Sequence, residues 1–151
     1  MKVDRFTADG TFTPPAGVTY AVAHIRGGGG GIARAVEDDA GAGGTSSVAF
    51  AGGTVSATGG AKAAVRATDN QAFNPSAGVA NGGQGAYLSS GSTTAANQAN
   101  GGRAGDGAYI VAGGAVTAGV GITVTVGAGG TAGTVSGAAG GSGYVWIEYL
   151  A

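Results

Sequence analysis

Few residues of this sequence are of a type that does chemistry, and they are scattered. His24 is the single histidine, so a zinc site or a histidine-based triad would have to do without a second imidazole. It lies within an apolar stretch that predicts a strand, which favours a structural role. Glu37 and Glu148 are the only glutamates, which gives paired carboxylates for glycoside cleavage little support. We therefore expect no catalytic residues and no enzymatic activity.

Two short stretches are rich in oxygen ligands. Glu37, Asp38 and Asp39 could bind a divalent cation, or they could form a solvated loop. The stretch 101–106 is similar to calcium-binding glycine–aspartate repeats, but it occurs once and its spacing is wrong. The pentaglycine at 27–31 is not a phosphate-binding loop, because no Gly-Lys-Ser/Thr follows it. We expect no bound metal and no cofactor.

Aromatic side chains are more suggestive of binding. Phe73, Tyr87 and Tyr109 lie within or at the edge of a region of Gly, Ala, Ser, Thr and Asn, which offers little core to bury them. Exposed rings on such a scaffold suit stacking on sugars or on another surface; the alternative is that they fill local clusters. Together with the charged Arg66 and Arg103, Phe73 and Tyr87 are the candidate binding residues.

Composition excludes several classes of protein. The chain has 151 residues, 35 glycines, 3 prolines, no cysteine and a net charge of −1. Few prolines and no sustained Gly-X-Y register exclude collagen, and the low charge is unlike a disordered chain. The near-neutral charge without a basic cluster argues against nucleic acid, and no stretch is long enough to predict a membrane span. Glycine-rich and weakly charged, the chain must hide its backbone by packing or assembly.

The sequence is organised around residues 18–26, a strongly predicted strand that ends in the pentaglycine. Residues 118–126 alternate apolar and small residues and predict another strand, and 45–51 with 54–58 predict a hairpin. We expect a single all-β domain over 1–151: a small, jelly-roll-like β-sandwich formed by 1–26 and 108–151, with a glycine-rich insert at 27–107. The strands at 2–6 and 143–150 should lie near each other, with Trp146 in the core.

Glycine recurs at every third residue near the C-terminus, at 127, 130 and 133 and again at 137, 140 and 143. Three residues is the repeat of an extended polyproline-II helix, and glycine on that repeat would let one helix lie flat on another. Part of the glycine-rich sequence is therefore a candidate for polyglycine-II packing, with irregular glycine loops as the alternative.

The order of these motifs resembles the glycine-rich domain of bacteriophage tail-fibre and minor tail proteins. The resemblance begins at Phe6 and Gly10-Thr-Phe-Thr-Pro-Pro-Ala-Gly-Val18, before the strand into the pentaglycine. It continues at Val126-Gly-Ala-Gly-Gly130 and ends at Gly141-Ser-Gly-Tyr-Val-Trp-Ile147. Family domains commonly end a longer fibre, whereas this sequence starts at Met1 without a shaft.

The resemblance implies a virion structural protein, made in the host cytoplasm and exposed on the particle. The leading hypothesis is a tail-fibre or tail-tip adhesin that binds a host glycan or protein, with Phe73, Tyr87, Arg66 and Arg103 as hypothetical receptor contacts. The alternative is a capsid decoration or head-fibre protein attached to the capsid lattice. Expected partners are other virion proteins and further copies of this chain, as a homotrimer.

Overall fold

The computed structural model describes residues 1–34, 40–65, 76–77, 83, 88–89, 104–133 and 138–151. Within these ranges the protein is all-β, as the sequence predicts. The strands are β1 (Lys2–Phe6), β2 (Gly10–Phe12), β3 (Tyr20–Arg26), β4 (Ile32–Arg34), β5 (Ser46–Phe50), β6 (Gly53–Ala57), β7 (Ala63–Val65), β8 (Ser76–Ala77), β9 (Leu88–Ser89), β10 (Tyr109–Ala115), β11 (Ile122–Thr125) and β12 (Tyr144–Tyr149).

Two antiparallel sheets of four strands form a β-sandwich. The strand order of the first, sheet A, is β1-β12-β3-β10, and that of the second, sheet B, is β2-β11-β5-β6. The first and last strands pair, with Lys2 opposite Tyr149 and Phe6 opposite Val145, which confirms that the two ends of the chain lie together. The predicted hairpin of β5 and β6 belongs to sheet B, so the sandwich also takes two strands from the segment expected as an insert.

The core lies between the sheets and follows the period-two pattern of the strands. Its fully buried side chains include Phe12, Ile25, Val48, Val124 and Ile147.

The expectation that Trp146 belongs to this core is wrong. In β12 the buried positions are Val145, Ile147 and Tyr149, and alternate residues of a strand point to opposite faces. Trp146 is therefore half-buried on the outer face of sheet A.

Beyond the sandwich, the glycine-rich segments pack side by side as extended chains. We call this assembly the glycine lattice; it comprises residues 27–32, 41–44, 58–61, 104–108, 127–133 and 138–143, together with Gly83. At its centre, the backbone N–H groups of 27–32 donate in three directions in turn. Gly28 and Gly31 donate to the segment 41–44, with N···O distances of 2.8 and 2.8 Å.

The other N–H groups of the central segment complete the pattern. Gly29 and Ile32 donate to Gly141 and Ala138, and Gly27 and Gly30 donate to Ala108 and Gly105, all at 2.8 to 3.0 Å. Every third N–H thus reaches the same neighbour, which is the hydrogen-bonding repeat of a three-residue helix. This observation confirms polyglycine-II packing in the described glycine segments.

The surrounding segments also bond to one another and close a ring around the centre. In order round the ring, each segment is bonded to the next: 41–44 to 58–61, 58–61 to 104–108, 104–108 to Gly83, Gly83 to 138–143, 138–143 to 127–133, and 127–133 back to 41–44. The donors and acceptors are Gly43 to Gly60, Gly105 to Ala61, Gly107 to Gly83, Gly83 to Ser142, Gly140 to Gly130 and Gly44 to Ala128, at 2.6 to 2.9 Å. The central segment also accepts bonds, from Gly60 on Gly28 and from Gly130 on Gly29, both at 2.8 Å. Its backbone is thereby enclosed.

The enclosure explains the pentaglycine. Residues 27–31 are all buried, whereas the ring segments also contain exposed residues such as Ala42, Ala128 and Thr131. A Cβ built on Gly30 would lie within 3.0 Å of the backbone of residues 60 and 61, and one on Gly28 would meet residues 127 and 128 equally closely. Among the described lattice glycines only Gly83 has a positive φ, so close approach of backbones requires these glycines.

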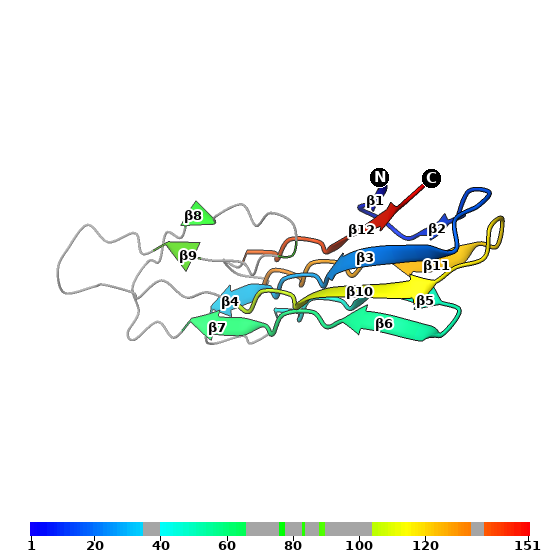
Figure 1. Cartoon of the computed structure of the whole chain (residues 1–151). Coiled ribbons are helices and arrows are strands. Elements are labelled where there is room, and N and C mark those ends of the chain that lie inside the picture. The colour runs from blue at the N-terminus through cyan, green and yellow to red at the C-terminus, as the bar shows by residue number, and fades with distance from the viewer. Residues whose placement is uncertain (35–39, 66–75, 78–82, 84–87, 90–103, 134–137) are drawn as a thin grey trace, which may run out of the picture.

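Figure 1 shows how the two parts are arranged. The sandwich carries both termini, and the lattice extends from it towards two small strand pairs, parallel β4–β7 and antiparallel β8–β9. The strands β3 and β10 each run directly into or out of a lattice segment, so the sheet and the lattice share continuous chains.

Candidate functional site

The four candidate binding residues, Phe73, Tyr87, Arg66 and Arg103, lie outside the described residues. The same holds for the acidic group Glu37, Asp38 and Asp39. The third aromatic singled out in the sequence, Tyr109, is described, and it leads to a cluster of rings on the outer face of sheet A.

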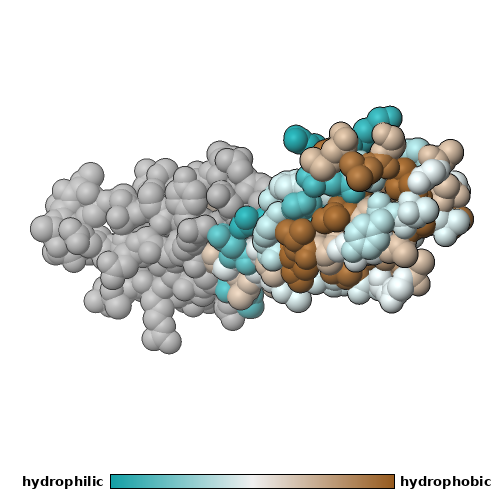
Figure 2. Space-filling view, in the orientation of Figure 1, coloured by the Kyte–Doolittle hydropathy of each residue, from teal (hydrophilic) through white to brown (hydrophobic). Residues whose placement is uncertain are grey.

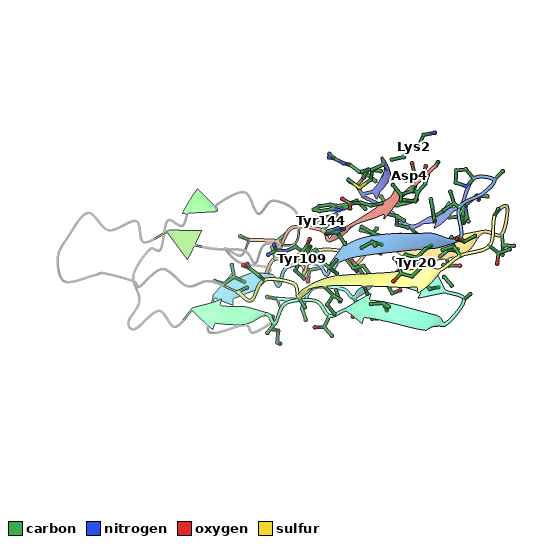
Figure 3. All side chains as sticks on the ribbon, in the orientation of Figure 1. Lys2, Asp4, Tyr20, Tyr109 and Tyr144 are labelled. Atoms are coloured by element: carbon green, nitrogen blue, oxygen red, sulfur yellow. The ribbon has the colours of Figure 1, made fainter. Side chains whose placement is uncertain are left out.

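The pairing register of β12, β3 and β10 brings the residues of this cluster together. Tyr144, Arg26 and Tyr109 lie in one row across β12, β3 and β10, and Trp146, His24 and Val111 lie in the next row on the same face. The rings of Tyr144 and Trp146 stack with centroids 5.1 Å apart, and His24 stacks on Trp146 at 4.9 Å. Figure 3 shows Tyr144 and Tyr109 at the end of the sheet that adjoins the lattice.

His24 links the two outer members of the cluster. Its Nδ1 lies 2.7 Å from the hydroxyl of Tyr109, and its Nε2 lies 3.7 Å from Oε2 of Glu148. The imidazole is thus held by β10 on one side and by β12 on the other, in addition to its stacking on Trp146. These contacts agree with the structural role expected for this histidine.

The row nearest the lattice contains an ion pair. Nη2 of Arg26 lies 3.7 Å from Oδ2 of Asp106, and the two side chains are only partly exposed. The buried Nε of Arg26 has no hydrogen-bond partner within the described part of the chain. Arg26 therefore fixes the last residue of β3 to a ring segment of the lattice.

The other end of the outer face is more exposed. Tyr20 is 58% exposed, and its ring covers Gly113, where a Cβ would lie within 3.0 Å of three atoms of the tyrosine. Beside it is a groove of about 330 Å³ lined by Met1, Gly17, Thr19, Tyr20, Ala21, Val22, Glu148, Tyr149 and Leu150. Glu148 thus borders both the groove and the ring cluster. In Figure 2, apolar residues alternate with polar ones over this side of the sandwich.

Chemically, the outer face can offer ring edges, a phenol, an imidazole and a carboxylate to a partner. The carboxylate–imidazole–phenol order differs from a nucleophilic triad, because a tyrosine replaces the serine and the carboxylate is at ion-pair rather than hydrogen-bond distance. We read the arrangement as a rigid binding or packing surface.

Sequence reasoning predicted a strand at 18–26, and in the structure the alternation of β3 places Tyr20, Val22 and His24 on one face. It missed that Trp146 and Glu148 join them. The available signal was that Tyr144, Trp146 and Glu148 also alternate, but only the pairing of β12 with β3 brings the two faces together.

Neither a metal site nor a membrane helix emerges from the described ranges. They contain no group of three or more His, Cys, Asp or Glu residues arranged to hold a metal ion, and no helix long and apolar enough to cross a bilayer. Comparison with models of protein families, with curated proteins and with solved structures found no match to this chain.

Proposed function

We propose that this chain is a non-enzymatic structural protein of a bacteriophage particle and serves as a tail-fibre or tail-tip adhesin that binds the host surface. It is made in the host cytoplasm and displayed on the virion, with other virion proteins, further copies of itself and a host glycan or protein as partners. The proposal begins from the resemblance of the motifs at 6–31, 126–130 and 141–147 to glycine-rich tail-fibre domains.

The glycine lattice is the observation that supports this proposal. Its order comes from backbone hydrogen bonds around residues 27–32, with the exposed positions, such as Ala42, Ala61 and Ala128, left free of packing demands. A scaffold of this kind keeps its shape while the sequences that connect its segments vary. Connections on a rigid scaffold are where binding residues concentrate, because they tolerate change.

On this basis Phe73, Tyr87, Arg66 and Arg103 remain the proposed receptor contacts. All four lie in the stretch between the ring segments 58–61 and 104–108. Their rings and guanidinium groups, on a background of methyl, hydroxyl and amide side chains, offer stacking faces and hydrogen bonds. Such a surface suits a saccharide better than a charged polymer.

The test measures adsorption of particles to host cells and yield of particles separately. Phe73→Ala and Tyr87→Ala should each lower adsorption while leaving particle assembly intact. Val120→Ala, which removes an exposed apolar side chain of the sandwich away from its outer ring cluster, is the control and should change neither. Loss of particles without a separate adsorption defect would contradict the adhesin role and place these residues in an assembly interface.

Location on the particle distinguishes the adhesin from its alternative. Gold-labelled antibody against the purified chain should mark the tail tip or fibres of intact virions. Labelling spread over the head would instead support capsid decoration, and absence of the chain from purified particles would overturn both.

A further inference from the structure

We propose that the free edge of β10 binds a second copy of this chain, antiparallel and across a two-fold axis, so that the two A sheets become one continuous sheet. The proposal concerns assembly and does not rest on the proposed adhesin function.

The first observation is that β10 is a long edge strand without protection. It has seven residues and pairs with β3 on one side, and no other strand of the described ranges pairs with its other side. Natural edge strands are usually short or blocked by charged residues, proline or a bulge. The sequence Tyr-Ile-Val-Ala-Gly-Gly-Ala of β10 contains neither a charged residue nor a proline.

The hydrogen bonds at both ends of β10 show which backbone groups face the free edge. Gly27 donates to the carbonyl of Ala108, and Val116 donates to the carbonyl of Thr19, each at 3.0 Å, and both pairs continue the register of β10 with β3. Hydrogen-bonded pairs alternate along an antiparallel ladder. The even-numbered residues of β10 therefore bond to β3, and the free edge presents the N–H and C=O groups of Tyr109, Val111, Gly113 and Ala115.

The side chains of β10 favour pairing of this edge with β10 of a second copy. Antiparallel self-pairing centred on Ala112 uses all seven residues and makes hydrogen-bonded pairs of the outward-facing ones. It also places each large residue opposite a small one of the second copy: Tyr109 opposite Ala115, Ile110 opposite Gly114, and Val111 opposite Gly113. The strand is thus large in its first half and small in its second, which is the complementarity that a two-fold axis requires.

Exposure and charge agree with this partner. Tyr109 and Val111 are 47% and 51% exposed, so their side chains have apolar area left to bury against the paired strand of the second copy. The net charge of the chain is only −1, so two copies repel each other little. A two-fold edge pairing yields a dimer, which differs from the homotrimer that the resemblance implies.

Cysteine cross-linking tests the register directly, because the chain has no cysteine of its own. Ala112 meets its own copy as a non-hydrogen-bonded pair, the closer of the two pair types and within reach of a disulfide. Ala112→Cys should give a covalent dimer under mild oxidation, at least tenfold more than the exposed control Ala8→Cys in the turn between β1 and β2. Equal cross-linking of the two variants would overturn the proposed register.

Light scattering tests the edge itself. At tens of micromolar the unmodified chain should scatter as a dimer, with twice the mass of 14.0 kDa of one chain. Val111→Lys should raise the dissociation constant of this dimer at least tenfold. Val111→Thr should change that constant by no more than threefold. Circular dichroism confirms that both variants fold. A monomeric unmodified chain, or a trimer indifferent to Val111→Lys, would overturn the proposal.

Discussion

The sandwich and the glycine lattice are held together in opposite ways. In the sandwich, side chains such as Ile25, Val48 and Ile147 are removed from water between two sheets. In the lattice, the central segment 27–31 has no side chains, and its order comes from N–H···O=C bonds to its neighbours. Removing methyl groups should therefore destabilise the sandwich, whereas adding one should destabilise the lattice. Mutations of these two kinds can test the two regions separately.

Ile147→Ala should have the largest effect, because this side chain is fully buried in the sandwich. Truncation of a buried isoleucine leaves a cavity and costs about 2–5 kcal/mol of unfolding free energy, measured by denaturant titration. The adjacent Trp146→Ala is the matched control on the outer face, and it should cost less than Ile147→Ala although it removes the larger side chain. The reverse order would mean that the two faces of β12 are assigned wrongly.

Gly30→Ala should destabilise the lattice although it adds only one methyl group. The new Cβ would lie within 3.0 Å of backbone atoms of residues 60 and 61, which belong to a hydrogen-bonded neighbour and cannot yield as a flexible side chain can. Overpacking of this kind costs about 1–3 kcal/mol.

Gly52→Ala is the control for this substitution, because a Cβ at Gly52 meets nothing within 4 Å and the residue lacks a positive φ. Its thermal stability should be unchanged or slightly raised, since alanine restricts the unfolded chain more than glycine does. If Gly30→Ala behaved like Gly52→Ala, the close packing at the centre of the lattice would be refuted.

Ser46→Ala should weaken the junction between the two regions. The Ser46 hydroxyl is buried, donates to the carbonyl of Arg26 at 2.6 Å and accepts from the N–H of Gly127 at 2.9 Å. It therefore satisfies one backbone group at the end of β3 and one at the start of a ring segment.

Its loss leaves both groups buried without this partner, at a cost of about 1–3 kcal/mol. Hydrogen exchange should show faster exchange at Gly127 in the variant. Ser56→Ala, on the exposed side of β6, is the control and should change neither exchange nor stability by more than about 0.5 kcal/mol. Unchanged exchange at Gly127 in Ser46→Ala would show that the hydroxyl does not hold the junction.

The same contrast explains what the sequence could predict. Strands β3, β11 and β12 were predictable because their side chains alternate, and a buried face has a period of two. Polyglycine-II packing was detectable only as the three-residue spacing of glycine at 127, 130 and 133 and again at 137, 140 and 143. The neighbours of each glycine segment were not predictable, since one glycine backbone offers the same donors and acceptors as any other and no side chain specifies the pairing.

The outer ring cluster was missed for a related reason. His24 and Trp146 are far apart in the sequence, and each is surrounded by residues that would suit a core strand equally well. Assigning Trp146 to the core followed its size, whereas the structure follows its place in the alternation, next to the buried Val145 and Ile147. The register between β3 and β12, which sets the cluster, is a long-range property that local patterns do not contain.

Tyr149 gives the smallest predicted effect, a pH dependence confined to alkaline conditions. Burial, then the negative charge of Asp4 and the hydrogen bond that the phenol donates to that carboxylate at 3.4 Å, raise the pKa of Tyr149 above its ordinary value of about 10. The folded state therefore holds the phenolic proton more tightly than the unfolded state does. Its contribution to stability is complete below pH ~10 and is lost as the pH rises through the folded-state pKa.

Removing either member of the Tyr149–Asp4 pair tests this contribution. Tyr149→Phe has no proton to lose, so its unfolding free energy should fall less steeply above pH ~10 than that of the unmodified chain, when the two are compared by denaturant titration from pH 8 to 11. Asp4→Asn keeps the acceptor but removes the charge, and it should give an intermediate slope, because burial, the larger cause, remains. If the unfolding free energies of all three chains fell equally steeply with pH, the folded protein would leave this phenol as open to water as the unfolded chain does.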